Sequence, residues 1–279
     1  YEYMGPAWYQ REIEIPVAWK GKRIFLYFER THWLSSVYVG KEEVSKIDYI
    51  SIPHNHELTQ WLHPGKKELI TFCIDNRYQY DTHKWDHAHS EFTQINWNGV
   101  LGEIKLVAVD PVYVDDMQVY PDIKNKSIKV KMTVRNCTEH TASGKISFHV
   151  TGKDYRLQKE VPVTVTDSIT YIEEEMFLGK DIHLWNEFHP NLYTLDCKLT
   201  SSVEGQSYAH EKSTTFGMRE VEAGEDHIIL NGEPIHLRGT VENAVFPKTG
   251  YAPVDDASWE RVLRILKEYG MNHMRFHSW

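Results

Sequence analysis

The sequence predicts a mainly β protein in which two successive β-sandwiches precede a strand–helix–strand unit. Short apolar runs that alternate with period two recur up to about residue 216, and Gly, Lys and Pro residues separate them. Pro111 interrupts the series and marks a boundary between two sandwiches. After Gly217 the alternation gives way to a helical period, so a different kind of structure begins there.

The first sandwich is expected over residues 1–110. Its predicted strands read WYQREIEIP, KRIFLYFE, SSVYVG, KKELITFCIDN and GEIKLVAVD. Between Asp75 and Phe92 lies a long polar and aromatic segment without periodicity. Loops of that length in compact domains are usually functional or disordered, and the aromatic residues favour a functional loop here.

The second sandwich is expected over residues 111–216. Its predicted strands read VYVDDMQVYP, SIKVKMTVRN, GKISFHVTG, QKEVPVTVT, TYIEEEMF, NLYTLDCKLTSS and SYAHEKSTTF. This number of short strands over such a length fits an immunoglobulin-like sandwich. The Cys–Trp–Cys pattern of antibody domains is absent from the sequence.

The segment 217–279 predicts a βαβ unit. Asn231-Gly232 is a strong turn signal for a hairpin, and a strand is predicted from Ile235 to Thr240. The second strand is predicted from His273 to His277, after a helix. A strand, a helix and a second strand in this order imply parallel pairing of the two strands.

The helix of this unit is predicted to begin near Ala257, with Asp255 or Asp256 as its cap. Gly270 stands where the residue after a helix end is commonly glycine. One apolar stripe at helical spacing contains Trp259, Val262, Leu263 and Leu266.

Composition excludes two classes of partner. The formal net charge is −9, whereas nucleic-acid binding needs clustered Lys and Arg, so no nucleic acid is expected. The longest run of large apolar residues is Ile24–Phe28, far short of the ~20 residues of a membrane span. The three cysteines are odd in number and far apart, which predicts small apolar residues on strands rather than disulfides.

Two histidine pairs raise the question of a metal. On a strand, His54-Asn55-His56 or His87-Ala88-His89 would place both imidazoles on one face. No third ligand is evident beside either pair. We therefore predict no metal and no cofactor.

Four segments together resemble glycoside hydrolase family 2, which contains β-galactosidases, β-glucuronidases and β-mannosidases. AWYQREIEIP with FERTHWLSSVYVG, and NWNGVLGEIKLVAV, resemble parts of the family's jelly-roll sugar-binding domain. LWNEFHPNLYTLDCKL resembles the last strands of its immunoglobulin-like domain. LNGEPIHLRGT and NHMRFHSW resemble the first and second strands of its (β/α)8 barrel.

The resemblance implies a jelly-roll sandwich over 1–110, an immunoglobulin-like sandwich over 111–216 and the start of a (β/α)8 barrel over 217–279. A barrel takes ~250 residues, so we expect the chain to end inside it. The family's acid/base and nucleophile Glu lie at the ends of the fourth and seventh barrel strands, beyond Trp279. We therefore expect no catalytic residue in this chain and no activity of the chain alone.

The activity that the resemblance implies for the whole protein is that of a retaining exo-β-glycosidase. It would be β-galactosidase-like, with a carbohydrate β-glycoside as substrate. The full-length enzyme is a candidate homo-oligomer. The sequence does not give the compartment, although the habit of polymer-degrading members favours the periplasm or the outside of the cell over the cytoplasm. The alternative is a non-catalytic carbohydrate-binding β-sandwich protein, which the aromatic loops favour.

Four candidate substrate-binding residues lie at the predicted barrel strand ends. The family's Arg on the second strand contacts the nucleophile, and Arg275 matches that motif. β-Galactosidases have Arg-x-Ser-His there, whereas here His277 stands one position earlier, which turns it to the other face of a strand. Glu242 and Asn243 stand in the region of the β-galactosidase RGVNRHE pattern and are candidate sugar contacts.

Two further candidates belong to the first sandwich. Family members send a loop from this domain towards the active site, and here that loop is Trp85 to Trp97. Asn96 and Trp97 are candidate substrate-binding residues on it, with Asn98 beside them. The alternative is a structural role, because Trp-Asn-Gly also suits a tight hairpin.

Overall fold

The structure is a computed structural model that describes residues 3–50, 52–77, 97–243, 246–250 and 252–277. It divides into two compact units, one made of Tyr1–Ala108 with Leu237–Trp279 and one of Val109–His236. The three-domain division at residues 110 and 216 stays a prediction.

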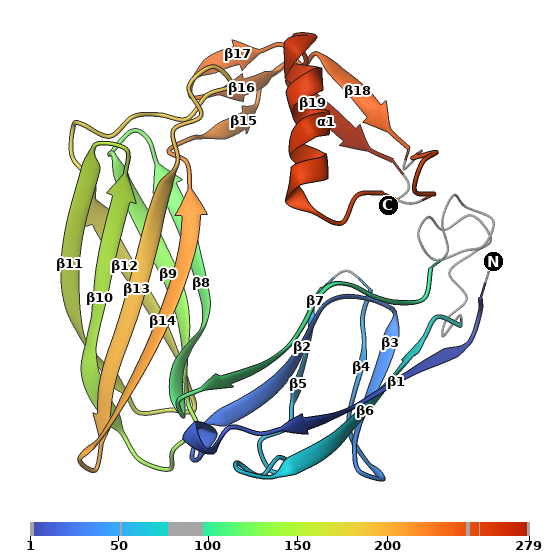
Figure 1. Ribbon diagram of the computed structural model, residues 1–279. Helices are drawn as coiled ribbons and strands as arrows, with labels where there is room; N and C mark the ends of the chain where they lie inside the picture. The colour runs from blue at the N-terminus through green and yellow to red at the C-terminus, as the bar shows by residue number, and fades with distance from the viewer. Residues whose placement is uncertain (1–2, 51, 78–96, 244–245, 251, 278–279) are drawn as a thin grey trace. The chain divides into compact units, whose positions relative to one another are not determined.

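The first sandwich has two antiparallel sheets, in the orders β1-β6-β3-β4 and β5-β2-β7 (Figure 1). A short 3-10 helix, Val17–Trp19, follows the first strand. The strands are β1 (Pro6–Glu14), β2 (Arg23–His32), β3 (Leu34–Val39), β4 (Glu42–Asp48), β5 (His54–Glu57), β6 (Lys67–Asp75) and β7 (Gly99–Val109).

Period-two alternation explains the core of this sandwich. Along β2, Ile24, Leu26 and Phe28 are buried and pack in one cluster with residues of β3 and β6, such as Val37 and Ile74. The strands predicted within residues 1–110 are confirmed, but β4 and β5 were missed. Their sequences, EEVSKID and HNHE, are almost wholly polar, so the apolar alternation that identifies a strand is absent.

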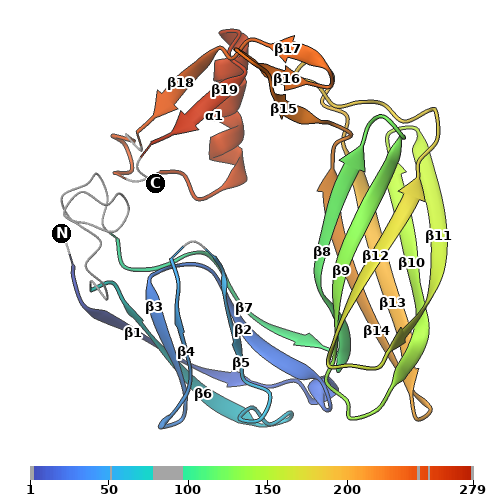
Figure 2. The same cartoon turned by 180° about the vertical axis from the view of Figure 1, so that it is seen from behind.

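The second sandwich contains all seven strands that the sequence predicts over residues 112–216. They form one sheet in the order β11-β10-β13-β14 and another in the order β12-β9-β8, and these lie as two layers (Figures 1 and 2). The strands are β8 (Val112–Asp122), β9 (Ser127–Asn136), β10 (Ala142–Gly152), β11 (Tyr155–Val165), β12 (Ile169–Phe177), β13 (Tyr193–Val203) and β14 (Gln206–Phe216).

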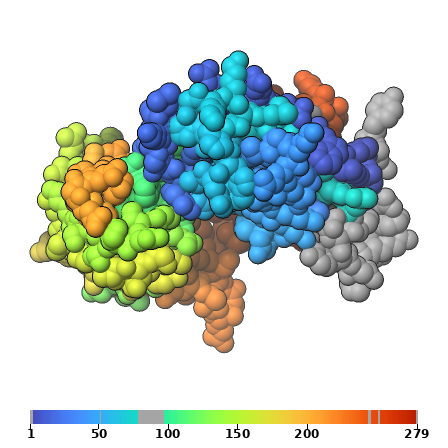
Figure 3. Space-filling view, turned by 90° about the horizontal axis from the view of Figure 1, so that it is seen from below, coloured from blue at the N-terminus to red at the C-terminus, as the bar shows by residue number. Residues whose placement is uncertain are grey.

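A continuous apolar cluster fills the space between these two layers. Phe148, Ile146 and Leu195 are among its fully buried members. Gly144 allows β10 to approach β13 closely, because a Cβ atom there would lie 1.9 Å from the backbone oxygen of Thr200. Figure 3 shows one end of this sandwich, in green, yellow and orange, as a filled surface.

A small antiparallel sheet follows, formed by β15 (Val221–Ala223), β16 (Ile228–Leu230) and β17 (Glu233–Ile235). The predicted Asn231-Gly232 hairpin is confirmed, since both residues have positive φ, 55° and 86°, as a type I′ turn requires. The predicted strand from Ile235 to Thr240 is wrong in its bounds. Ile235 pairs with Ile228 in the hairpin, and a separate strand begins only at Gly239.

The βαβ unit consists of β18 (Gly239–Glu242), α1 (Asp256–Glu268) and β19 (His273–Phe276). The two strands pair in parallel, as predicted, and α1 covers one face of the pair in both views (Figures 1 and 2). The side chain of Asp255 accepts a hydrogen bond from the Ser258 amide and caps the helix. In the described part of the chain, no helix is long and apolar enough to cross a membrane.

Candidate functional site

Arg275 lies on β19 and is exposed. It stands in register with Val241 of β18, while Phe276 stands in register with Glu242. The Phe276 ring contacts the Trp259 ring of α1 with centroids 5.7 Å apart, so Phe276 faces the helix. Since successive side chains of a strand point to opposite faces, Arg275 lies on the face of the pair away from the helix.

The candidates at the strand ends therefore do not share one face. Glu242 is half-buried and, by its register with Phe276, lies on the helix side of the sheet. The backbone amide of His277 donates to the Glu242 carbonyl at 2.9 Å, which extends the ladder one residue past β19. Continued alternation places His277 on the side of Arg275. Asn243 follows β18 and is exposed.

A hydrogen-bonded clamp at the start of both strands sets their register. The Asn272 amide donates to the Arg238 carbonyl at 2.9 Å, and the Arg238 amide donates to the Asn272 side-chain oxygen at 2.8 Å. The Arg238 Nε also donates to the carbonyl of Gly270, which follows the C-cap of the helix, at 2.7 Å. The clamp fixes which residue of β18 stands beside Arg275. Neither residue was predicted from the sequence.

The second group of candidates lies at one end of the first sandwich, where Trp97 precedes β7. The Trp97 carbonyl accepts from His32 Nδ1 at 2.6 Å and from Asn76 Nδ2 at 3.1 Å, and the rings of His32 and Trp97 lie 5.0 Å apart. The carbonyl can only accept, so Nδ1 of His32 carries a proton. Asn96 lies outside the described residues.

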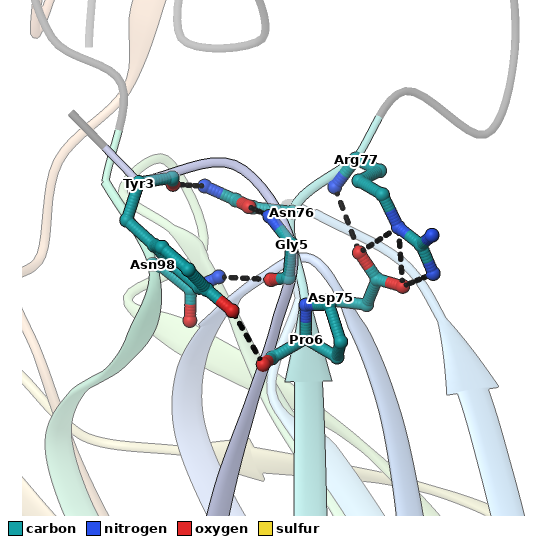
Figure 4. Close-up of polar contacts among 7 residues, drawn as sticks. All are labelled: Tyr3, Gly5, Pro6, Asp75, Asn76, Arg77 and Asn98. Atoms are coloured by element: carbon teal, nitrogen blue, oxygen red, sulfur yellow. Dashed lines mark hydrogen bonds and ion pairs between the residues drawn. The ribbon is translucent and has the colours of Figure 1, made fainter.

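Asn76 is the centre of this end of the sandwich (Figure 4). Its side-chain oxygen accepts from the Gly5 amide and its nitrogen donates to the Tyr3 carbonyl, both at 2.9 Å. Asn98 donates to the Gly5 carbonyl at 2.7 Å. The backbone before β1 is thus tied to the segments that follow β6 and precede β7.

Beside Asn76, the Arg77 guanidinium bonds the Asp75 carboxylate, with Nε 3.0 Å from both oxygens (Figure 4). These hydrogen bonds hold the pKa of Asp75 below its usual range. The sequence predicted no role for His32, Asn76 or Arg77. The available signal was the polar run that directly follows the apolar strand β6.

A groove of about 470 Å³ lies elsewhere on the first sandwich and contains none of the predicted site residues. β1, β7 and the short 3-10 helix line it, with the Trp19 side chain among charged residues of β1. The lining residues are Arg11, Glu12, Ile13, Glu14, Pro16, Trp19, Ile104 and Leu106.

The chemistry that these residues can perform is binding and orientation of other groups. Arg275 offers a planar fork of donors suited to a carboxylate. Glu242 is the one carboxylate within the two described strands β18 and β19. A retaining glycosidase needs two carboxylates ~5–5.5 Å apart, and Glu242 alone does not supply them.

Residues 112–219 match the family model described as glycosyl hydrolases family 2. A β-galactosidase of Thermoanaerobacter pseudethanolicus is 24% identical over 98% of this chain and 36% of its own length. A putative β-glucuronidase of Formosa agariphila is 25% identical over 97% of this chain and 25% of its own length. These matches confirm the resemblance to glycoside hydrolase family 2. The chain spans only about a quarter to two fifths of the curated relatives it matches.

Solved structures share the fold. A putative β-galactosidase of Bacteroides fragilis superposes with a TM-score of 0.82 at 19% identity, over 99% of this chain and 42% of that one. A β-glucuronidase of Bacteroides uniformis gives a TM-score of 0.79 at 19% identity, over 98% of this chain and 33% of that one.

Proposed function

We propose that these residues belong to a glycoside hydrolase of family 2, which hydrolyses O-glycosyl bonds of a carbohydrate β-glycoside with retention of configuration. The observation that carries the proposal is Arg275 at the carboxyl end of a strand in a parallel βαβ unit, on the face away from the helix. In (β/α)8 barrels the catalytic groups gather at the carboxyl ends of the strands. β18 and β19 are then the first two strands of such a barrel.

The role proposed for Arg275 follows from its charge and geometry. Its guanidinium donates two parallel hydrogen bonds to a carboxylate nucleophile supplied by a later strand, which keeps that carboxylate ionised and oriented. His277, on the same side by alternation, is proposed to contact substrate. Trp97, Asn96 and Asn243 are proposed as further sugar contacts.

Glu242 is a less suitable substrate contact than Arg275, since its register places it on the helix side of the strand pair. We retain it as a contact at the strand end, not as a catalytic carboxylate. The 279 residues alone are then inactive, because both catalytic carboxylates come from other strands. The sugar that the enzyme prefers, galactose or a uronic acid, is decided by residues of those strands.

The test compares the 279-residue chain with the protein extended over a whole barrel, on a panel of chromogenic β-glycosides. The extended protein should hydrolyse one class of sugar, with retention seen by NMR of the first-formed anomer, and the 279-residue chain should hydrolyse none. Hydrolysis by the short chain would overturn the assignment of the carboxylates. Binding of oligosaccharides without hydrolysis by the extended protein would favour a carbohydrate-binding protein instead.

Variants of the extended protein test the role of Arg275. Arg275→Ala should lower kcat by on the order of 10²-fold, as loss of a preorganised charged donor does, and Arg275→Lys should restore only part of it. Arg264→Ala is the matched control, since Arg264 is exposed on α1. Equal kcat values for both alanine variants would exclude Arg275 from the reaction.

A further inference from the structure

A chain of buried polar side chains crosses the otherwise apolar interior of the first sandwich. His54 and His56 of β5 are 0% exposed, and so is Ser35 of β3 from the other sheet. Thr31 of β2 is 1% exposed, and Ser45 of β4 is half-buried. Two imidazoles and three hydroxyls therefore join four strands and both sheets. The proposed glycosidase chemistry uses none of these groups.

The partners fix the direction of each hydrogen bond. His54 Nε2 lies 2.9 Å from the Tyr49 carbonyl, which can only accept, so Nε2 carries the proton and Nδ1 accepts from the Ser35 hydroxyl at 2.6 Å. The Ser35 hydroxyl already donates its one hydrogen to His54, so towards His56 it can only accept. His56 Nε2 therefore donates to the Ser35 oxygen at 2.8 Å. His56 Nδ1 then accepts from Ser45 at 2.7 Å. Both rings are neutral Nε2–H tautomers.

An added proton breaks this order. A proton on His54 Nδ1 removes the acceptor of the Ser35 hydroxyl, and one on His56 Nδ1 does the same to Ser45. The new charge would also be buried beside neutral groups, the Phe28 ring on His56 and the Thr31 hydroxyl on His54. Asp48, at the end of β4, is the charged group that acts on His54 among the described residues.

Burial lowers the pKa of both imidazoles, which agrees with the cost of an added proton. It lowers the pKa of His56 to about 3, with the neighbouring His54 as a second cause. Burial also lowers the pKa of His54, against the opposing influence of the Tyr49 carbonyl and Asp48. An unfolded histidine has a pKa of about 6.5.

The chain lies next to the candidate sugar contact Trp97. Thr31, which contacts His54, directly precedes His32, whose ring donates to the Trp97 carbonyl. The segment from Thr31 to Ser35 joins β2 to β3 and is buried throughout. This segment therefore takes part both in the buried chain, through Thr31 and Ser35, and in the contact of His32 with Trp97.

We propose that the hydrogen-bonded chain Ser45–His56–Ser35–His54–Tyr49 is an acid-sensitive latch that holds the two sheets of the first sandwich together beside Trp97. The latch is fully effective above pH ~6.5, where the rings are neutral in both the folded and the unfolded state. Below that pH the unfolded state binds more protons than the folded state, so stability is lost progressively down to about pH 3, where folded His56 is protonated too.

The first experiment reads the rings directly and needs no glycosidase activity. Long-range ¹H–¹⁵N NMR of the 279-residue chain, histidine-labelled, should show His54 and His56 as Nε2–H tautomers at pH 8, with His56 unchanged down to pH 5 and His54 protonated only below the ordinary pKa of a histidine. The exposed His63 of the same sandwich gives the signals of a solvent-accessible ring for comparison. Titration of either buried ring near pH 6.5, or an Nδ1–H tautomer, would overturn the proposal.

The second experiment measures the latch by native-state hydrogen exchange, corrected for intrinsic rates, at pH 5 to 7.5. As the pH falls, the opening equilibrium constant of the amides of residues 31–36 should rise by up to tenfold per pH unit for each ring. The opening equilibrium constants of amides of β9 and β13 should not change with pH in this way. His56→Gln should reduce the pH dependence of the opening equilibrium constant by the contribution of one ring. The control His63→Gln should leave this pH dependence unchanged. A slope unaltered by His56→Gln would reject the latch, and the NMR result decides if that variant does not fold.

Discussion

Asn76 shows how one side chain can hold several backbone segments. It is 1% exposed, and its amide serves the Gly5 amide and the carbonyls of Tyr3 and Trp97. Each such bond contributes about 1 kcal/mol net, but a buried donor or acceptor left unpaired costs about 1–3 kcal/mol. The residue therefore matters more through the groups it satisfies than through its own burial.

Asn76→Ala should lower the free energy of unfolding of the first sandwich by about 2–4 kcal/mol, because the Gly5 amide and the Tyr3 carbonyl lose this partner and the Trp97 carbonyl keeps only its bond from His32. Urea unfolding followed by tryptophan fluorescence measures the change. Asn55→Ala is the matched control, since Asn55 lies on the exposed face of β5 and its replacement should change stability by less than about 0.5 kcal/mol. Equal effects of the two variants would contradict the role of Asn76.

The three cysteines differ sharply in their environment. Cys197 is 1% exposed beside Met132, and burial raises the pKa of its thiol to about 12. Cys73 is also buried, with a raised pKa whose main cause is burial, whereas Cys137 is exposed. Since the thiolate is the reactive form, the three cysteines should react at different rates.

Iodoacetamide at pH 8 should modify Cys137 first, and Cys197 only after unfolding in urea. Peptide mass spectrometry with time points measures the order. The variant Cys137→Ser should lack the fast phase. A fast phase that persists in this variant would mean that a buried thiol is accessible.

At the scale of elements, strands and helices were predictable wherever buried apolar residues recur along the sequence with the period of a strand or a helix. The seven strands of the second sandwich alternate clearly, and α1 begins within one residue of its expected start because Asp255 caps it. β5 could not be predicted, since its buried residues are His54 and His56, whose burial depends on serines of two other strands, β3 and β4. Tertiary hydrogen bonds of this kind leave no periodic signal in the sequence.

The candidate site was predictable only in part for the same reason. Arg275 follows from a local motif, and its face follows from strand alternation. The Arg238–Asn272 clamp and the partners of Asn76 join residues that are 34 and up to 73 positions apart. Such pairs depend on register, which the sequence alone does not state.

Close approach of two strands gives a sharp prediction for β10. In Gly144→Ala, the new Cβ atom would lie 1.9 Å from the Thr200 carbonyl oxygen, so β10 and β13 must separate. Overpacking of this kind costs about 1–3 kcal/mol or more, measured as a lower free energy of unfolding in urea. Ser143→Ala, at the exposed neighbouring position, is the control and should have little effect. A stable Gly144→Ala variant would show that the strands can shift apart freely.

At the scale of the whole molecule, the unit Val109–His236 has its own apolar core and complete sheets. Expressed alone, residues 109–236 should fold, give dispersed amide NMR spectra and unfold cooperatively. Phe148 is 1% exposed, so Phe148→Ala should destabilise this fragment by about 3–5 kcal/mol. The same loss is expected in the 279-residue chain. A fragment that remains disordered would mean that this sandwich depends on the rest of the chain.

The pairing of β1 with β6 has a consequence for biosynthesis. Pro6 of β1 pairs with Asp75 of β6, so β1 leaves the ribosome long before its partner exists. At ~5–20 residues per second, that interval lasts roughly 3–14 s. During it, Trp8, Tyr9 and Ile13 of β1 are open to chaperones that bind nascent apolar segments. The second sandwich has no comparable wait between β10 and β11, which pair through a tight hairpin as soon as both are made.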